Sequence, residues 1–181
     1  GQRRRRNIEY LDGSVLPAVV HTAPIRNSGG NLELALEISA DISEIQRLQE
    51  KLRSSEQRYQ QLFDEAPCYI TVQNRSFKLL ATNRRFKEDF GEGIGHCCYE
   101  IYKHRKHPCE ECPVAKTFAD GLSHQSEMVV NSVSNEKIHV LITTAPLLGP
   151  DGEIEQVMEM SANITQIREL QDHLSSLGFL I

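Results

Sequence analysis

Hydrophobic and polar residues alternate along residues 32–38, with an apolar side chain at every second position and Glu33 and Glu37 between them. A period of two is typical of a β-strand with one buried face. A second apolar segment, residues 15–21, precedes this strand and is connected to it through Ala23-Pro24 and a glycine-containing turn. The two segments therefore predict a β-hairpin.

The same pattern occurs twice in the chain. When the sequence is shifted by 122 residues, Thr22–Pro24 falls on Thr144–Pro146, and Ser39–Ser43 falls on Ser161–Thr165, without a gap. Internal repeats of this kind reflect a repeated structural unit. We expect the tail of one module, followed by a complete copy of the same module.

Each hairpin runs into a helix whose start carries a capping-box pattern. Asp41 is followed three residues later by Glu44, and Asn163 is followed three residues later by Gln166. In such a box the first side chain accepts from free backbone amides and the second reaches back. The pattern predicts a helix after each hairpin.

After each cap, the spacing between apolar residues changes to alternating steps of three and four, as in the seam of a coiled coil. The second helix carries Ile167, Leu170, Leu174, Leu177 and Ile181, and the first carries Ile45, Leu48 and Leu52. Two interpretations are open: each helix lies on its own domain, or two chains pair in parallel. The common register favours pairing, which predicts a homodimer through the linker helices. Two or three heptads are marginal alone, so domain contacts must contribute.

The second copy contains further elements that complete a domain. Its alternating segments predict five strands, and its glycine-closed or amphipathic segments predict short helices between the second and third strands. The predicted strands are 69–72, 77–80, 127–131, 137–144 and 154–162, and the predicted helices are 83–90, 99–104 and 114–119. This order predicts an α+β fold, with a five-stranded antiparallel sheet and short helices on one face. Met158 and Met160, in the last strand, are predicted to line the core.

Charge and composition narrow the function. The chain has 20 Lys and Arg against 25 Asp and Glu, a net charge of −5, which argues against a nucleic-acid binder. No apolar run approaches the roughly 20 residues of a membrane-spanning helix. Phosphate-binding loops, nucleophile elbows and paired-carboxylate motifs are absent from the sequence, so we expect this segment not to be an enzyme. The odd number of cysteines, five, favours a reducing, cytoplasmic location.

Four of these cysteines cluster with histidines. The candidate metal or redox residues are His96, Cys97, Cys98, His107, Cys109 and Cys112. A Cys-x-x-Cys pair suits zinc, an iron–sulfur cluster or a redox disulfide. Thiols that simply pack in the interior are the other interpretation. Covalent haem attachment is excluded because Pro113, and not histidine, follows Cys112.

Several motifs together resemble the PAS sensory domain. They are Leu62–Pro67 before the first strand, Asn83 opening a helix that ends at Phe90-Gly91, the Ala-Pro/Gly hairpin, and the closing Asn163-Ile164-Thr165. The resemblance implies a sensor of small molecules, redox state or light that signals through helical linkers. It also implies that Asp41, Glu44, Asn163, Thr165 and Gln166 couple the last strand to the output helix. A flavin photoreceptor is disfavoured, because Tyr99–Tyr102 replaces the motif that follows the reactive cysteine in that group.

The resemblance also implies a domain organisation. Residues 1–43 are the C-terminal strands of a first PAS domain, residues 44–63 a linker helix, residues 64–163 a complete PAS domain, and residues 164–181 a signalling helix. The final segment resembles the approach to the dimerisation helices of bacterial sensor histidine kinases. The implied role is to relay a ligand or redox signal to a kinase. The alternative is a metal or iron–sulfur redox module built on the cysteine cluster.

Overall fold

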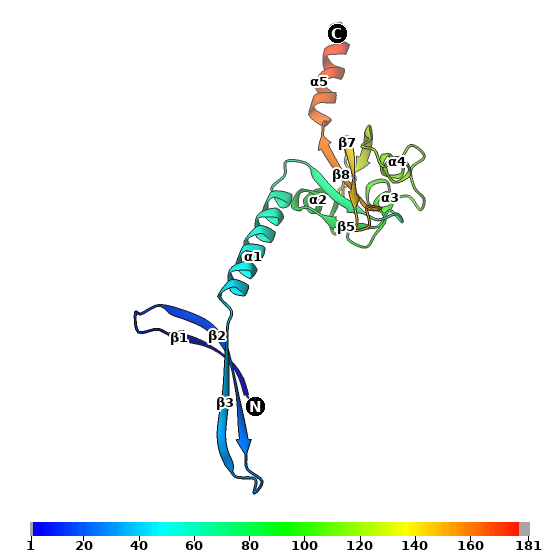
Figure 1. Cartoon of the computed structure of the whole chain (residues 1–181). Helices are drawn as coiled ribbons and strands as arrows, with labels where there is room; N and C mark the ends of the chain where they lie inside the picture. Colours follow the sequence, from blue (N-terminus) through cyan, green and yellow to red (C-terminus); the bar gives the residue numbers. More distant parts are fainter. Residues whose placement is uncertain (1, 178–181) are drawn as a thin grey trace. The chain divides into compact units, whose positions relative to one another are not determined.

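The computed structural model describes residues 2–177. The chain divides into two compact units, residues 1–59 and residues 60–181 (Figure 1). The seam position Ile181 lies outside the described residues.

The first unit is a three-stranded antiparallel sheet followed by a helix. The strands β1 (Gln2–Glu9), β2 (Val15–Arg26) and β3 (Leu32–Asp41) pair in the order β1-β2-β3. The helix α1 (Ser43–Asp64) begins directly after β3 and continues into the second unit. The predicted hairpin and the helix after it are confirmed.

The second unit contains one five-stranded sheet, short helices between its second and third strands in sequence, and a helix after its last strand. Its elements are β4 (Tyr69–Gln73), β5 (Leu79–Thr82), α2 (Arg84–Phe90), α3 (Cys98–Lys103), α4 (Pro113–Asp120), β6 (Gln125–Asn131), β7 (Lys137–Leu148), β8 (Ile154–Asn163) and α5 (Thr165–Ser176). The strands are antiparallel in the order β5-β4-β8-β7-β6, so β8, the last strand in sequence, lies in the middle of the sheet. The predicted α+β fold, with its five-stranded antiparallel sheet, is confirmed.

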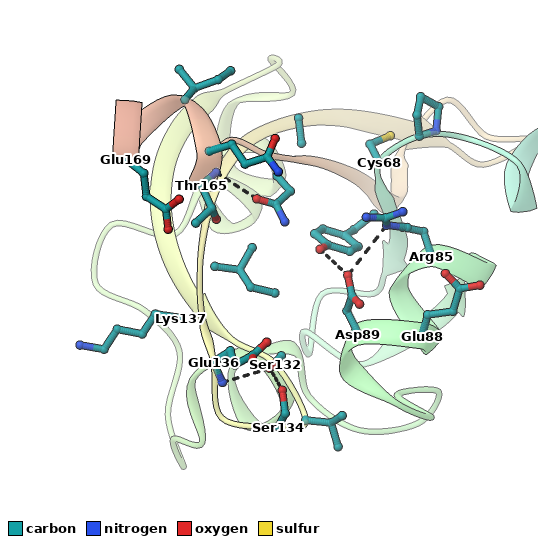
Figure 2. A pocket seen from close by; sticks show the side chains of 18 residues that line it. Cys68, Arg85, Glu88, Asp89, Ser132, Ser134, Glu136, Lys137, Thr165 and Glu169 are labelled. Carbon is teal, nitrogen blue, oxygen red and sulfur yellow. Dashed lines mark hydrogen bonds and ion pairs between the residues drawn. The ribbon is translucent and has the colours of Figure 1, made fainter. Parts of the chain in front are cut away.

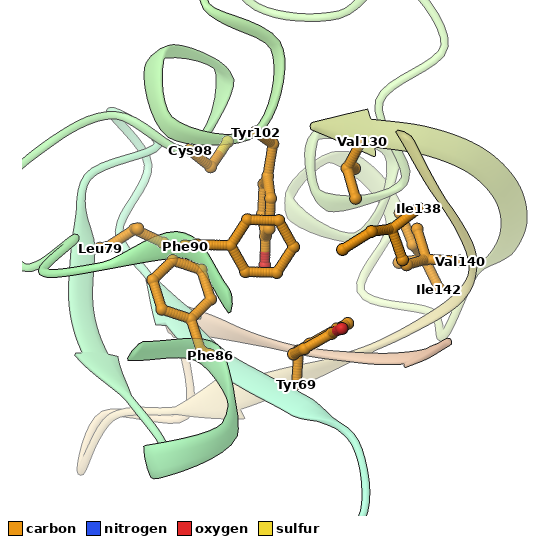
Figure 3. Close-up of a cluster of buried hydrophobic side chains, with 10 residues drawn as sticks. All are labelled: Tyr69, Leu79, Phe86, Phe90, Cys98, Tyr102, Val130, Ile138, Val140 and Ile142. Atoms are coloured by element: carbon orange, nitrogen blue, oxygen red, sulfur yellow. The ribbon is translucent and has the colours of Figure 1, made fainter. Parts of the chain in front are cut away.

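Aromatic rings fill the space between the sheet and the short helices (Figure 3). The Tyr102 ring packs edge-on against Phe86 at 5.5 Å and Phe90 at 5.0 Å, and Phe90 packs edge-on against Tyr69 at 5.0 Å between centroids. Edge-to-face pairs at such distances are favourable beyond the area that they bury. One aromatic cluster thus fixes α2 and α3 on the sheet.

The two units repeat the same backbone pattern at the predicted offset of 122 residues. Thr22 pairs with Glu37 as Thr144 pairs with Glu159, and both hairpins shift register at the same point, after Ile25 and after Leu147. The turn before the hairpin, between β1 and β2 in the first unit and between β6 and β7 in the second, also has a residue with positive φ at the same position, 82° at Gly13 and 64° at Asn135. The repeat is therefore a structural repeat of three strands and a helix start.

The buried face of β8 differs from the predicted one. Val157, Glu159 and Ser161 are buried, whereas Met158 and Met160 lie on the opposite face and are half-buried. The prediction that the two methionines line the core is wrong. Successive side chains of a strand point to opposite faces, so the choice of face decides every position at once.

The apolar stripes of α1 and α5 are exposed in the single chain. Ile45, Leu48 and Leu52 are 55–61% exposed, and Ile167, Leu170 and Leu177 are 58–60% exposed. Leu174 is half-buried. The coiled coil stays a prediction, since a second chain is needed to form it. Over residues 2–177, no helix is both long enough and apolar enough to cross a bilayer.

Candidate functional site

A small cavity of about 30 Å³ lies between α3, α4 and the sheet. Its wall combines thiols, hydroxyls, apolar side chains and one carboxyl group. It is lined by Cys98, Tyr99, Tyr102, Lys103, Cys109, Cys112, Pro113, Met128, Val130, Ile142 and Glu159. A cavity of this volume accommodates one or two water molecules, because the centre of a single water needs roughly 10–15 Å³ of open space.

Glu159 is the buried carboxyl group of this cavity. It is 5% exposed, and its carboxylate accepts hydrogen bonds from Gln73 Nε2 at 3.0 Å and from Ser161 Oγ at 3.2 Å. Burial raises the pKa of Glu159 above its usual value, and the hydrogen bonds from Ser161 and Gln73, together with the nearby Tyr102 hydroxyl, partly offset this rise. A buried carboxyl with a raised pKa binds a proton more readily than an exposed one.

Two polar atoms beside Glu159 have no hydrogen-bond partner of ordinary geometry. They are the Tyr102 hydroxyl, which lies close to Thr71 and Glu159, and Gln73 Oε1. An unpaired buried polar atom costs about 1–3 kcal/mol, so a small group in the cavity that pairs with the hydroxyl of Tyr102, a residue of the cavity wall, recovers part of this energy. The cavity is therefore suited to a water molecule or to a small polar group.

The predicted cysteine cluster is brought together only in part. Cys98, Cys109 and Cys112 line the cavity, and Figure 3 shows Cys98 above the aromatic cluster beside Tyr102. Cys97 precedes α3, and its sulfur lies 3.7 Å from the Ser76 carbonyl oxygen. The predicted ligands His96 and His107 are exposed. All five cysteines are free thiols.

Within residues 2–177, no group of three or more His, Cys, Asp or Glu residues is arranged to hold a metal ion. Zinc sites in proteins use three or four such side chains. The three thiols of the cavity nevertheless influence one another. Burial raises the pKa of Cys98, and Glu159, Cys112 and Cys109 raise it further. Burial also raises the pKa of Cys112, with smaller contributions from Glu159 and Cys109, and the backbone amides of Ala115 and Val114 partly offset this rise. Buried thiols of this kind stay protonated and packed at neutral pH.

Three of the predicted coupling residues, Asn163, Thr165 and Gln166, lie where β8 passes into α5, and the other two, Asp41 and Glu44, lie where β3 passes into α1. Asn163 Oδ1 accepts from the Thr165 backbone N–H at 3.0 Å, and Thr165 Oγ1 accepts from the His139 N–H at 3.0 Å. The first copy repeats the first of these bonds, since Asp41 Oδ1 accepts from the Ser43 N–H at 2.7 Å. In both copies the side-chain oxygen accepts from the backbone N–H two residues later, and not three residues later. The geometry is therefore an Asx turn ahead of the helix and not the predicted capping box.

The other members of those predicted boxes, Glu44 and Gln166, are exposed in the first turns of α1 and α5. Glu44 is the acidic residue of the first turn of α1. A negative charge there is favourable because it opposes the helix dipole.

A groove of about 750 Å³ surrounds the start of α5 (Figure 2). It is bounded by α2, by the turn between β6 and β7, and by the β8–α5 junction with Asn163, Thr165 and Gln166. The Tyr69 hydroxyl donates to Asp89 Oδ2 at 2.6 Å, and Arg85 lies 3.8 Å from the same oxygen. Burial and Asp89 raise the pKa of Tyr69 to about 12, so its proton stays in this bond. Tyr69 thus connects the buried aromatic cluster to Asp89 of α2 on the wall of this groove.

Sequence reasoning missed Glu159, Gln73, Tyr102 and Asp89. The repeat aligns Glu159 with Glu37, but it also aligns the exposed Glu155 with Glu33, so this signal alone did not single out Glu159. The other three have no local signal, since their neighbours come from distant segments.

Comparison with known proteins identifies the fold. The profile of the PAS fold family matches residues 63–169, more than half of the chain. No curated protein sequence matches the chain.

Solved structures agree with this match. The PAS domain of an HTR-like protein from Haloarcula marismortui is 18% identical, with a TM-score of 0.55 over 66% of this chain and 99% of that one. The PAS domain of a protein from Colwellia psychrerythraea is 14% identical, with a TM-score of 0.53 over 61% of this chain and 97% of that one. An RNA-binding Light-Oxygen-Voltage receptor is 9% identical, with a TM-score of 0.54 over 99% of this chain and 82% of that one. At these identities the likeness concerns the fold, and together with the profile it shows that the chain belongs to the PAS fold family.

Proposed function

We propose that this chain is a sensory and dimerisation segment of a bacterial signal-transduction protein, a sensor histidine kinase of the cytoplasm. The interior of its PAS domain takes up a ligand or responds to redox state. The change passes through β8 to α5 and on to a kinase output. In this proposal the segment itself carries no catalytic function. The cytoplasmic location is supported by its five free thiols.

One observation carries the proposal: β8 contributes Glu159 to the wall of the cavity and leads directly into α5, the proposed output helix. Glu159 and Ser161 share the buried face of this strand, and Asn163 at its end holds the first amide of α5. The Ile164 N–H also donates to the His139 carbonyl at 2.8 Å, which ties the helix start to β7. A shift of the strand by a ligand at Glu159 therefore moves the helix start directly, without a flexible connection.

The exposed stripes of α1 and α5 support a parallel homodimer. Full burial of a leucine side chain contributes about 1.5–3 kcal/mol, so a seam of three or four such residues per chain is a substantial driving force. Packed helices of this kind have discrete registers, which allows a small shift to become a two-state signal.

The structural repeat supports the interpretation of the first unit as the C-terminal strands of a preceding PAS domain. In the second unit, β4 pairs with Val157–Ser161 of β8. The repeat aligns this edge with residues 35–39 of β3, so a strand of the β4 type completes the first sheet at that edge.

Dimerisation is tested by light scattering on the whole chain at tens of micromolar. We expect a dimer that Leu48→Lys and Leu170→Lys convert to a monomer, since each places a charge in the seam. The controls Glu50→Lys and Asp172→Lys introduce the same charge on the exposed opposite side of α1 and α5 and should leave the dimer intact. A monomeric parent protein, or equal loss in the controls, would contradict the proposal.

A second candidate function is a metal or iron–sulfur redox module. It is favoured by the convergence of Cys98, Cys109 and Cys112 on one cavity. Metal analysis of anaerobically purified protein decides it, because less than about 0.2 equivalents of zinc or iron per chain rejects a cluster of three or four ligands.

A further inference from the structure

Cys109 and Cys112 are separated by a two-residue turn, Glu110-Glu111. In a β-turn the first and fourth Cα atoms lie less than about 7 Å apart. Disulfide bonds join residues whose Cα atoms are about 4.4–6.8 Å apart. A turn of this size therefore brings the two cysteines close to the separation that a disulfide needs.

The two thiols differ in access and in surroundings. Cys109 is partly exposed, and Lys103 lies near it. Burial lowers the pKa of Lys103, and the Cys109 sulfur partly offsets this lowering. Cys112 is 7% exposed and is the N-cap of α4. Burial raises the pKa of Cys112, while the backbone N–H groups of Ala115 and Val114 lower it. The accessible Cys109 is therefore the thiol that meets a small disulfide in solution, and the buried Cys112 exchanges with a sulfur that is already held beside it.

We propose that Cys109 and Cys112 form a reversible dithiol–disulfide switch that is oxidised by a low-molecular-weight disulfide. The Cys109 thiolate attacks one sulfur of the small disulfide, a mixed disulfide forms, and one small thiolate leaves. The Cys112 thiolate then attacks the Cys109 sulfur, and the second small thiolate leaves. In total, two protein thiols are oxidised to one disulfide, and one small disulfide is reduced to two small thiols, which carry the two protons.

Oxidation at this position reaches the interior because Cys112 borders the same cavity as Glu159. Its side chain packs with Val114 of α4 and Val157 of β8 in a second buried cluster. The helix α4 is also fixed to the sheet by a hydrogen bond of 2.7 Å between Thr117 Oγ1 and Thr144 Oγ1. Withdrawing the Cys112 sulfur into a disulfide therefore alters the packing against β8. That this change reaches a kinase output rests on the function proposed above.

The switch is tested by equilibrating the whole chain with buffers of reduced and oxidised glutathione. Thiol exchange is stopped with acid, the protein is denatured, and free thiols are labelled with a maleimide. Intact mass should show five labels on the reduced protein and three on the oxidised protein, since the chain has five cysteines. Peptide mapping should find the bond between residues 109 and 112.

Four variants make the assignment specific. Cys109→Ser and Cys112→Ser should each remove the intramolecular disulfide, whereas Cys98→Ser and Cys68→Ser should retain it. Hydrogen exchange of β8 amides and the near-ultraviolet tyrosine signal of Tyr99 and Tyr102 should change on oxidation of the parent protein and not of Cys109→Ser.

Five labels at every glutathione ratio, or a disulfide that maps to Cys98, would overturn the switch. Oxidation without any change at β8 would overturn the link to the strand while leaving the disulfide itself established. These results are independent of the light-scattering experiment, because a chain that fails to dimerise still forms or fails to form the bond. Failure of the switch and failure of the proposed signalling function are therefore separable.

Discussion

Replacing Asn83 by alanine should destabilise the PAS domain more than any other single polar change. This side chain is fully buried at the start of α2, and it makes four hydrogen bonds to the backbone. Its Oδ1 accepts from the Ile70 N–H at 3.0 Å and the Phe86 N–H at 3.1 Å. Its Nδ2 donates to the Cys68 carbonyl at 2.9 Å and the Phe63 carbonyl at 3.2 Å. One amide thus joins the end of α1, the strand β4 and the helix α2.

The magnitude follows from the groups that lose their partner. Loss of a helix N-cap costs about 1 kcal/mol, and each buried backbone group left unpaired costs about 1–3 kcal/mol. Allowing for partial relaxation, we expect Asn83→Ala to cost about 3–5 kcal/mol, against a total stability of about 5–15 kcal/mol for a domain. In Asn83→Ser the hydroxyl can still cap α2 but cannot reach Cys68, so this variant should lie between alanine and the parent.

Native-state hydrogen exchange of β4 and α2 amides measures the effect within the PAS domain. A loss of about 3 kcal/mol lowers protection about 100-fold. The control is Arg84→Ala, one position along, where more than half of the side chain is exposed and its ion pair with Glu65 is worth less than about 1 kcal/mol. If Asn83→Ala and Arg84→Ala lower protection equally, the four hydrogen bonds are not what holds these elements together.

Three further outcomes follow from the same interior. Since the folded pKa of Glu159 is raised, its protonated form favours folding, and this advantage is lost as pH rises from about 4.5; Glu159→Gln should therefore raise Tm at pH 8 and change it little at pH 4. A methyl group on Gly93 would lie 2.8 Å from the Phe86 ring, so Gly93→Ala should cost about 1–3 kcal/mol by urea unfolding. Thr165→Val leaves the His139 N–H without its acceptor, so it should cost about 1 kcal/mol and speed exchange at the start of α5.

Controls on the same elements separate these effects from general surface changes. Glu155→Gln alters an exposed acid of β8 and should leave the pH dependence of Tm unchanged. A Gly93→Ala variant as stable as the parent protein would show that the aromatic core accommodates the added methyl group. A slope of Tm with pH that is the same with and without Glu159 would refute the raised pKa.

The local patterns of the sequence were sufficient for the elements and their order. Alternation placed the strands of both hairpins, and the change of period placed α1 and α5. The gapless offset of 122 residues also predicted the strand register, because two copies without a gap should have equally paired hairpins. The pairing of Thr22 with Glu37 and of Thr144 with Glu159 confirms this. These features depend on neighbours that are close in sequence or on a direct copy of them.

The site could not be predicted in the same way, because it is assembled from distant segments. Gln73 and Glu159 are separated by 86 positions, and their hydrogen bond exists only because β4 and β8 are neighbours in the sheet. The cysteine motif indicated thiols in one region but not which of them face inward. That choice is made by the packing of α3 and α4, which buries Cys98 and Cys112 and leaves Cys97 at the surface side of the turn.

The misassigned face of β8 has a physical cause that the two copies make visible. In β3, Leu34, Leu36 and Ile38 form the apolar row, and the acids occupy the alternate positions. The equal register places that row on the face that in β8 carries Gln156, Met158 and Met160, opposite the cavity. Alternation in a strand predicts that its two faces differ in polarity, but it does not predict which face packs against the helices. The neighbouring residues that bind a carboxyl decide this: Gln73 and Ser161 make it possible to bury Glu159, so an acidic position became the interior one and the apolar position the exterior one.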